Sequence, residues 1–255
     1  MNTLNMRMAV GVATIVGLGL AAVPAVEAGG KSKPPIPLKE AKLNIEHNAT
    51  DHDTGFQGAI DSEGWKRLDV VGPDGPVLTF KGRGELAELG LTELFFETVE
   101  PENVDVPIAD MLAKLPEGNY TISGPAQENG ESLGRTEGVA LLTHVIPAGP
   151  ALLTPAAGAT VPTTGLVVSW APVTQTINGG PVTIIAYQLI VEKDAAPHPH
   201  MIGKMNSLSM YLSPNVTSIT LPNGFLEAGA PYSWEVLAIE ESGNQTLSSS
   251  AFATQ

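Results

Sequence analysis

Short apolar runs that alternate with polar residues recur along most of this chain, and they constrain its fold more than any other feature. From Ala41 onward the runs are separated by Gly, Pro, Asn and Asp. Leu43, Ile45 and His47, for example, would lie on one face of a strand. A period of two residues is that of a half-buried β-strand, and the intervening residue types favour turns. We therefore predict an all-β fold.

The expected strands form two groups, separated by the segment Pro147–Pro150, in which two prolines flank Ala and Gly. The first group comprises 41–47, 56–61, 65–71, 76–80, 93–98, 119–123 and 137–145. The second comprises 151–154, 166–171, 183–192, 207–212, 216–220, 231–240 and 246–253. Helical spacing at 84–91 and 106–115 predicts short crossover helices in the first group. The chain should thus hold two tandem β-sandwiches, at 41–146 and 149–255.

The first 28 residues have the features of an export signal. Arg7 precedes an apolar run from Met8 to Val26, and the following Ala28 ends a motif typical of signal peptidase sites. We predict cleavage after Ala28. The alternative is an uncleaved anchor, because the 19 residues of the run can just span a bilayer. Residues 29–40 read as a solvated linker, so we expect a secreted protein, extracellular or periplasmic, without a membrane span after cleavage.

Charge and cysteine content narrow the possible partners. The net charge is −14, and cleavage leaves it unchanged because Arg7 and Glu27 are removed together. Such a surface repels phosphate backbones, so we do not expect nucleic acid as a partner. The absence of cysteine excludes disulfides and thiol catalysis. An exported animal protein would more often carry disulfides, which favours a bacterial source.

The second group of strands resembles a fibronectin type III domain. Leu166–Pro172 is similar to the second strand of that family, Ile185–Val191 to the third, and Leu226–Tyr232 to its leucine–glycine–tyrosine corner. The core residues that this resemblance implies are Trp170, Tyr187, Leu226, Gly229, Tyr232 and Val236. In the first group, Gly118–Ile122 resembles the late strands of bacterial immunoglobulin-like sandwiches. These scaffolds host many roles, so neither resemblance identifies a functional site.

The densest polar cluster lies between two strands of the first group. It contains Asn48, Asp51, Asp53, Asp61 and Glu63. Carboxylate and amide oxygens are the ligands that calcium prefers, so these five residues are a candidate calcium site. Their spacing does not fit the EF-hand loop. The favoured interpretation is an Asx-rich turn whose side chains bond to their own backbone.

Two further sets of possible metal ligands carry weaker signals. His47 and His52 could bind zinc with a nearby Asp, but two ligands five residues apart at a strand end match no known zinc geometry. His198, His200 and the methionines near them are soft ligands that could hold copper. The favoured interpretation of the latter set is a long hairpin insertion whose methionines pack on the sandwich edge, because the ligand spacing is irregular. We therefore expect no cofactor, with calcium as the one possible exception.

The function expected from these features is non-catalytic. A secreted or cell-surface adhesion or structural module would present its sandwich loops to an extracellular protein or polysaccharide. The alternative is a metal-dependent or carboxylate-based hydrolase that acts on an extracellular polymer through Asn48–Glu63. No H-E-x-x-H motif or phosphate-binding loop supports an enzyme.

Overall fold

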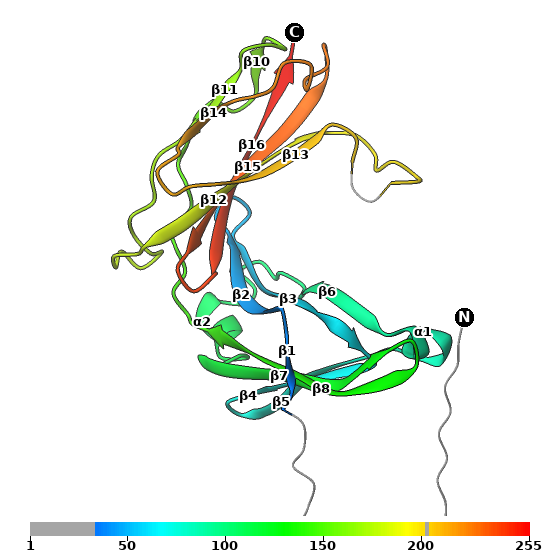
Figure 1. The fold of residues 1–255 in the computed structure, drawn as a ribbon. Coiled ribbons are helices and arrows are strands. Elements are labelled where there is room, and N and C mark those ends of the chain that lie inside the picture. Colours follow the sequence, from blue (N-terminus) through cyan, green and yellow to red (C-terminus); the bar gives the residue numbers. More distant parts are fainter. Residues whose placement is uncertain (1–33, 202–203) are drawn as a thin grey trace, which may run out of the picture. The chain divides into compact units, whose positions relative to one another are not determined.

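The computed structural model describes residues 34–201 and 204–255, and its strands confirm the predicted all-β fold (Figure 1). The predicted signal peptide, residues 1–28, lies outside the described residues. Residues 34–255 form one compact unit with two separate hydrophobic cores. We refer to residues 34–146 as the first module and to residues 147–255 as the second. No helix among the described residues is long and apolar enough to cross a bilayer.

The first module is a β-sandwich with two short helices. Its elements are β1 (Ile36–Pro37), β2 (Glu40–Asn48), β3 (Asp53–Trp65), β4 (Arg67–Gly72), β5 (Gly75–Lys81), α1 (Gly84–Leu89), β6 (Leu91–Glu97), α2 (Ile108–Leu112), β7 (Gly118–Glu128) and β8 (Glu131–Leu142). One layer has the order β2-β3-β6, and the other has the order β1-β8-β7-β4-β5. Strand β3 joins the layers, because its last residue, Trp65, pairs with Ala126 of β7.

Alternate residues of these strands fill the first core. Ile45, Phe56, Ile60 and Leu68 are almost completely buried, and Trp65 is 0% exposed. The helix α2 adds Met111 to this core, as its helical spacing implied. Burial of this apolar surface stabilises the module at about 25 cal/mol per Å².

The second module is also a β-sandwich. Its strands are β9 (Leu152–Thr154), β10 (Ala159–Val161), β11 (Val167–Trp170), β12 (Ile184–Lys193), β13 (Ser207–Leu212), β14 (Ser218–Thr220), β15 (Pro231–Glu240) and β16 (Gln245–Thr254). One layer has the order β14-β11-β9, and the other has β16-β15-β12-β13.

The five side chains that the resemblance placed in the core are buried in this sandwich. The sixth residue, Gly229, instead allows an unusual backbone conformation. Trp170, Tyr187, Tyr232 and Val236 are at most 1% exposed. Gly229 has φ of 67°, a left-handed conformation that glycine adopts without strain. The Tyr232 hydroxyl accepts a hydrogen bond from the Glu227 N–H at 2.9 Å, which closes the expected corner.

Strand β16 connects the two modules in one sheet. It pairs with β15 on one side and runs parallel to β2 on the other, with Gln245 opposite Glu46 and Leu247 opposite Asn48. Figure 1 shows β2 and β16 side by side where the modules meet. A continuous sheet of order β6-β3-β2-β16-β15-β12-β13 therefore crosses the module boundary.

Three expectations about local structure are wrong. Residues 34–40 are not a solvated linker, because β1 pairs with β8 and Leu38 packs on the first core. The strands predicted at 56–61 and 65–71 are not separated by a loop at 62–64, because β3 continues to Trp65 with a register shift after Asp61. The helix expected at 106–115 is confined to Ile108–Leu112, since Pro107 sets its start. Strand β10 was not predicted.

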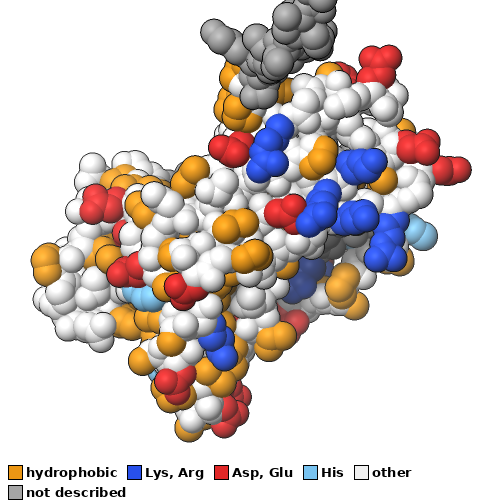
Figure 2. Space-filling view, turned by 90° about the horizontal axis from the view of Figure 1, so that it is seen from below, with side chains coloured by type: hydrophobic (Ala, Val, Ile, Leu, Met, Phe, Trp, Pro, Cys, Tyr) orange, Lys and Arg blue, Asp and Glu red, His pale blue; other side chains and the backbone are white. Residues whose placement is uncertain are grey.

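Basic side chains are gathered on one side of the face shown in Figure 2, although the chain is acidic. Arg67, Lys81 and Arg135 are exposed on β4, β5 and β8, three strands of the same layer. Arg67 is paired with Asp69 at 2.7 Å, and Arg135 lies 3.5 Å from Glu137. Carboxylates therefore neutralise part of this basic surface, which weakens its attraction for polyanions.

Candidate functional site

A groove of about 580 Å³ crosses the continuous sheet at the β2–β16 junction and is the candidate functional site. Its lining comes from all seven strands of the sheet and from Gly243 in the β15–β16 turn. Asn44 lies opposite Gln57 on β3, which lies opposite Glu97 on β6. On the other side of the junction, Gln188 of β12 lies opposite Tyr211 of β13. The groove exists because side chains of alternate residues all point to the same face of one sheet.

Amides and carboxylates make up most of the polar lining. They are Glu40, Asn44, Glu46, Gln57, Glu97, Gln188, Glu235 and Gln245, with Lys42 as the only basic residue. Lys42 is paired with Glu40 at 2.6 Å. Amides both donate and accept hydrogen bonds, whereas ionised carboxylates only accept. The groove therefore suits a ligand rich in hydroxyl or amine donors and disfavours an anion.

Aromatic side chains lie on both sides of the junction. All Phe, Tyr and Trp residues of the chain fall within the described residues, and only Phe95 and Tyr211 among them are exposed. Phe95 is 62% exposed and Tyr211 is 71% exposed, and both line the groove. An exposed aromatic ring is an apolar platform with a polar edge or hydroxyl, and such rings are enriched where a ligand is bound.

A hydrogen-bonded network orders the centre of the groove. The Gln245 side-chain amide donates to Glu46 and, at 3.0 Å, to Gln57. The Gln57 amide donates to Glu97 at 2.7 Å. Glu46 is 8% exposed, and burial raises its pKa. Burial also raises the pKa of Glu235, and the charge of Glu46 raises it further. These groups are fixed by their neighbours, so they present a rigid polar surface.

Three carboxylates at one end of the groove could hold a cation. Ligand atoms of Glu46, Glu97 and Glu100 lie within 4.8 Å of one another. Burial, followed by the charges of Glu46 and Glu97, raises the pKa of Glu100 to about 7. One Glu100 oxygen is buried without a hydrogen-bond partner, as is one oxygen of the nearby Asp53. The sequence does not reveal this cluster, since its members meet only through the pairing of β2, β3 and β6.

The five predicted calcium ligands do not converge on one point. Asp61 and Glu63 lie eight and ten residues beyond Asp53 on the extended strand β3. At about 3.3 Å per residue, Asp53 and Asp61 are roughly 26 Å apart. Glu63 is paired with Lys39 at 3.1 Å. The five therefore cannot ligate a single ion together, and of them only Asp53 acts on the Glu100 carboxylate.

The Asx-rich turn accounts for the other two residues of that set. The Asn48 side-chain oxygen accepts hydrogen bonds from the N–H groups of Thr50 and Asp51, at 2.9 and 3.0 Å. Its amide donates to the Asp51 carboxylate at 2.9 Å. His52, with φ of 61°, completes the turn in a left-handed conformation. Calcium binding at this loop stays a prediction, but the turn needs no ion to satisfy its polar groups.

Among the described residues, no group of three or more His, Asp or Glu ligands gathers around either set of histidines. His47 is buried, and its Nδ1 lies 3.0 Å from both the Asp53 carbonyl and the Thr54 hydroxyl. Burial lowers its pKa. In the 197–210 segment the rings of His198 and His200 are exposed with centroids 6.0 Å apart. Of the methionines there, only Met210 packs on the second core.

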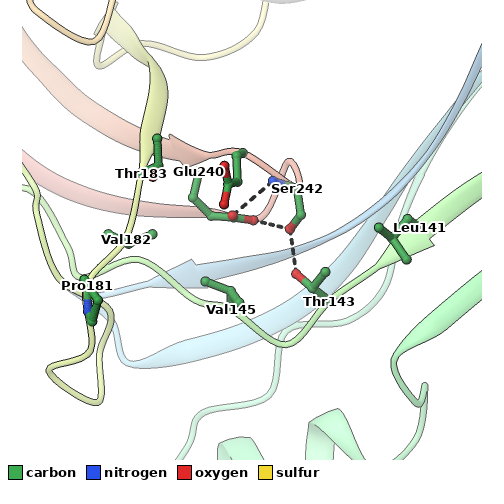
Figure 3. A pocket seen from close by; sticks show the side chains of 9 residues that line it. Leu141, Thr143, Val145, Pro181, Val182, Thr183, Glu240 and Ser242 are labelled. Atoms are coloured by element: carbon green, nitrogen blue, oxygen red, sulfur yellow. Dashed lines mark hydrogen bonds between the residues drawn. The ribbon is translucent and has the colours of Figure 1, made fainter.

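Figure 3 shows a second hollow, of about 620 Å³, beside the junction. Three of its polar side chains, those of Thr143, Glu240 and Ser242, are already paired with one another. The Ser242 hydroxyl bonds to Thr143 at 2.6 Å and to the buried Glu240 carboxylate, which also accepts from the Ser242 N–H. Few polar atoms remain to orient a ligand, so we assign this hollow a structural role.

Comparison with known proteins gives structural neighbours but no family. No protein-family model matches the chain, and no curated protein matches it. Solved structures that resemble it include a segment of two fibronectin type III domains from chicken tenascin, at 13% identity and a TM-score of 0.31. That match covers 85% of this chain and 99% of the segment. The FN1–FN3 domains of chicken CNTN1 match at 12% identity and a TM-score of 0.31, covering 87% of this chain and 66% of theirs. The sandwich assignment rests on the strand pairing and the two cores.

Proposed function

We propose that this chain is a non-catalytic secreted binding protein that holds an extracellular polysaccharide in the groove across β2 and β16. The observation that carries the proposal is the position of Phe95 and Tyr211, the two exposed aromatic residues, on the lining of this groove. Apolar faces of sugar rings can pack on such side chains, while the hydroxyl groups of the sugars bond to the amides and carboxylates between them.

The acidic lining of the groove limits the classes of polysaccharide that it can bind. Four glutamates line it, and Lys42, its one basic residue, is already paired with one of them. A uronic-acid or sulfated polymer would therefore be repelled. The proposed ligand is a neutral or amine-bearing polysaccharide. Of the two expected partner classes, protein and polysaccharide, the groove favours the second because its lining is polar, open and flanked by aromatic rings.

Affinity electrophoresis in gels that contain a soluble neutral polysaccharide tests this proposal. Migration of the wild-type protein should be retarded by at least one polymer of a panel of glucans, mannans, xylans and soluble chitosan. Retardation should fall about tenfold or more in Tyr211→Ala and Phe95→Ala. The control variant Val139→Ala, which alters a 55%-exposed residue on β8, should behave as wild type. Equal binding by all four proteins would refute the groove as the site.

The hydrolase alternative makes a different prediction for the same polymers. Glu46 and Glu235 are carboxylates of the groove with raised pKa values, a property that catalytic acids share. Hydrolysis would release reducing ends during prolonged incubation, whereas binding alone would release none. The earlier form of this alternative, built on Asn48–Glu63, loses support because Asp61 and Glu63 lie far from Asp53 along β3.

A further inference from the structure

A second groove, entirely different in chemistry, opens between the edge strands of the first module. Within the described residues β5 pairs only with β4, and β6 pairs only with β3, so both strands are edges. Between them lies a cavity of about 480 Å³. That volume falls in the range of about 300–1,000 Å³ typical of small-molecule sites.

The walls of this apolar groove are almost wholly hydrocarbon. Its floor is the first core itself, where Phe56, Val70 and Met111 are at most 5% exposed. Its rim carries Leu78, which is 36% exposed, and Val99, which is 85% exposed. Apolar side chains left open to water at a cavity mouth favour a ligand that covers them.

The ends of the apolar groove limit the shape of an occupant. At one end the rings of Phe80 and Phe96 pack with centroids 5.2 Å apart and join the two edge strands. At the other end α2 and the residues that follow it close the cavity. Pro76 also removes a backbone donor from the β5 edge. A short closed cavity of this kind fits a flexible chain better than an added strand or a folded element.

The lining of the apolar groove carries a single charged side chain. No Asp or Glu lines the apolar groove, and Lys114 is its only ionisable residue. Lys114 is exposed, and it forms no ion pair with any carboxylate of the described residues. The chain has 27 acidic and 13 basic residues, and yet the one charge on the lining of this apolar cavity is positive. It complements an anionic group held at the mouth.

We infer that the apolar groove binds an amphiphile with an unbranched acyl chain and an anionic head, such as a fatty carboxylate. The acyl chain lies on Phe56, Val70 and Met111, and the head group pairs with Lys114. This site is separate from the groove across β2 and β16, because the two have no lining residue in common. Leu43 and Phe56 line the apolar groove, whereas their neighbours Asn44 and Gln57 line the other groove, on the opposite faces of β2 and β3.

Displacement of a fluorescent fatty acid from the purified protein tests the inference. Saturated carboxylates of eight, ten and twelve carbons are titrated below the concentrations at which they form micelles. Each added methylene should tighten binding by about fourfold, the equivalent of about 0.8 kcal/mol. Dodecanol, which lacks the charge, should bind several-fold more weakly than dodecanoate. No displacement by any of these ligands would overturn the proposal.

Variants separate the acyl site from the head-group contact. Lys114→Gln should weaken dodecanoate several-fold and leave dodecanol unchanged; equal loss for both would overturn the role of Lys114. Val99→Asp should weaken both ligands at least tenfold, while Val104→Asp, at a residue that is 83% exposed and does not line the groove, should have no effect. Equal effects of the two aspartates would show that binding occurs elsewhere. Sedimentation velocity adds a last test: a dimer that Val99→Asp dissociates would assign the groove to a second copy of the chain.

Discussion

The side-chain oxygen of Asn244 accepts a hydrogen bond from the backbone N–H of Ile45 at 2.8 Å, although 199 positions separate the two residues. The Asn244 amide donates to the carbonyls of Thr143 and Val145 at 2.9 and 2.8 Å. Asn244 is 1% exposed, and its own N–H bonds to Glu240. One buried side chain therefore ties together the first module, the segment between the modules and the β15–β16 turn.

Replacement of Asn244 by Ala should lower the free energy of unfolding by about 2–4 kcal/mol. The change leaves the buried Ile45 N–H and two carbonyls without partners, and unsatisfied buried groups each cost about 1–3 kcal/mol. Urea denaturation followed by tryptophan fluorescence measures the loss. Asn215→Ala, at an exposed turn residue, should be nearly neutral. A loss at Asn244 no larger than that of the control would contradict this account of the junction.

Gly149 should tolerate no side chain. A Cβ atom there would lie 2.5 Å from the Ala49 Cβ and 2.7 Å from the Ser248 hydroxyl oxygen, because three segments meet at this point. Overpacking of this kind costs about 1–3 kcal/mol, so Gly149→Ala should lower the melting temperature by several degrees. Gly180→Ala is the matched control, since its nearest contact would be an ordinary 3.4 Å. Similar melting temperatures for the two variants would show that the segments around Gly149 can move apart at little cost in stability.

Stability should decrease as the pH rises from about 5 to 7.5. Burial and neighbouring carboxylates raise the pKa of Glu100 to about 7, above its usual value of 4.5, so the folded state binds a proton that the unfolded state releases. The folded state is then favoured at low pH, and that contribution is lost through this window. Because Glu100 is partly exposed, we expect an effect of order 1–2 kcal/mol. In urea titrations Glu100→Gln should flatten the profile, and the exposed Glu131→Gln should not.

Calcium should raise the melting temperature at pH 7.5 if the cluster of Glu46, Glu97 and Glu100 binds it. A divalent cation would relieve the repulsion between carboxylates whose ligand atoms lie within 4.8 Å. Calorimetry with 5 mM calcium or with a chelator measures the shift. Glu97→Gln should abolish it, and Asp61→Asn should leave it intact, because Asp61 lies at the far end of β3. A shift lost in Asp61→Asn alone would favour the originally predicted set of ligands.

Many strands of the fold can be predicted from local sequence patterns. The expected bounds of β13 and β15 agree with the structure, because period-two alternation and flanking turn residues mark both strands. Strand β3 was expected to break near Gly64, a residue that favours turns. The structure keeps it extended because Gly64 packs against the Gln127 carbonyl, where a Cβ would lie at 2.1 Å. Close backbone approach and a turn require the same residue, so sequence alone does not distinguish them.

The candidate groove could not be predicted in the same way. Glu46, Glu97 and Gln245 are ordinary polar residues at solvent positions of their own strands. They meet only because β6 pairs with β3, β3 with β2 and β2 with β16, and nothing in these segments specifies their partner strands. The predicted Asp-rich loop was conspicuous because its residues are adjacent in sequence. Its hydrogen bonds are local for the same reason, which explains why Asn48 and Asp51 satisfy each other.

The parallel pairing of β2 with β16 also determines when, during synthesis of the chain, the continuous sheet can form. Strand β2 is synthesised early, yet its partner follows about two hundred residues later, with Gln245 opposite Glu46. Until then one edge of β2 has no strand to pair with, and the polysaccharide groove has only one wall. Contacts of such long sequence separation form slowly. A chain that is still being synthesised can therefore acquire its proposed binding activity only when β16 has been made.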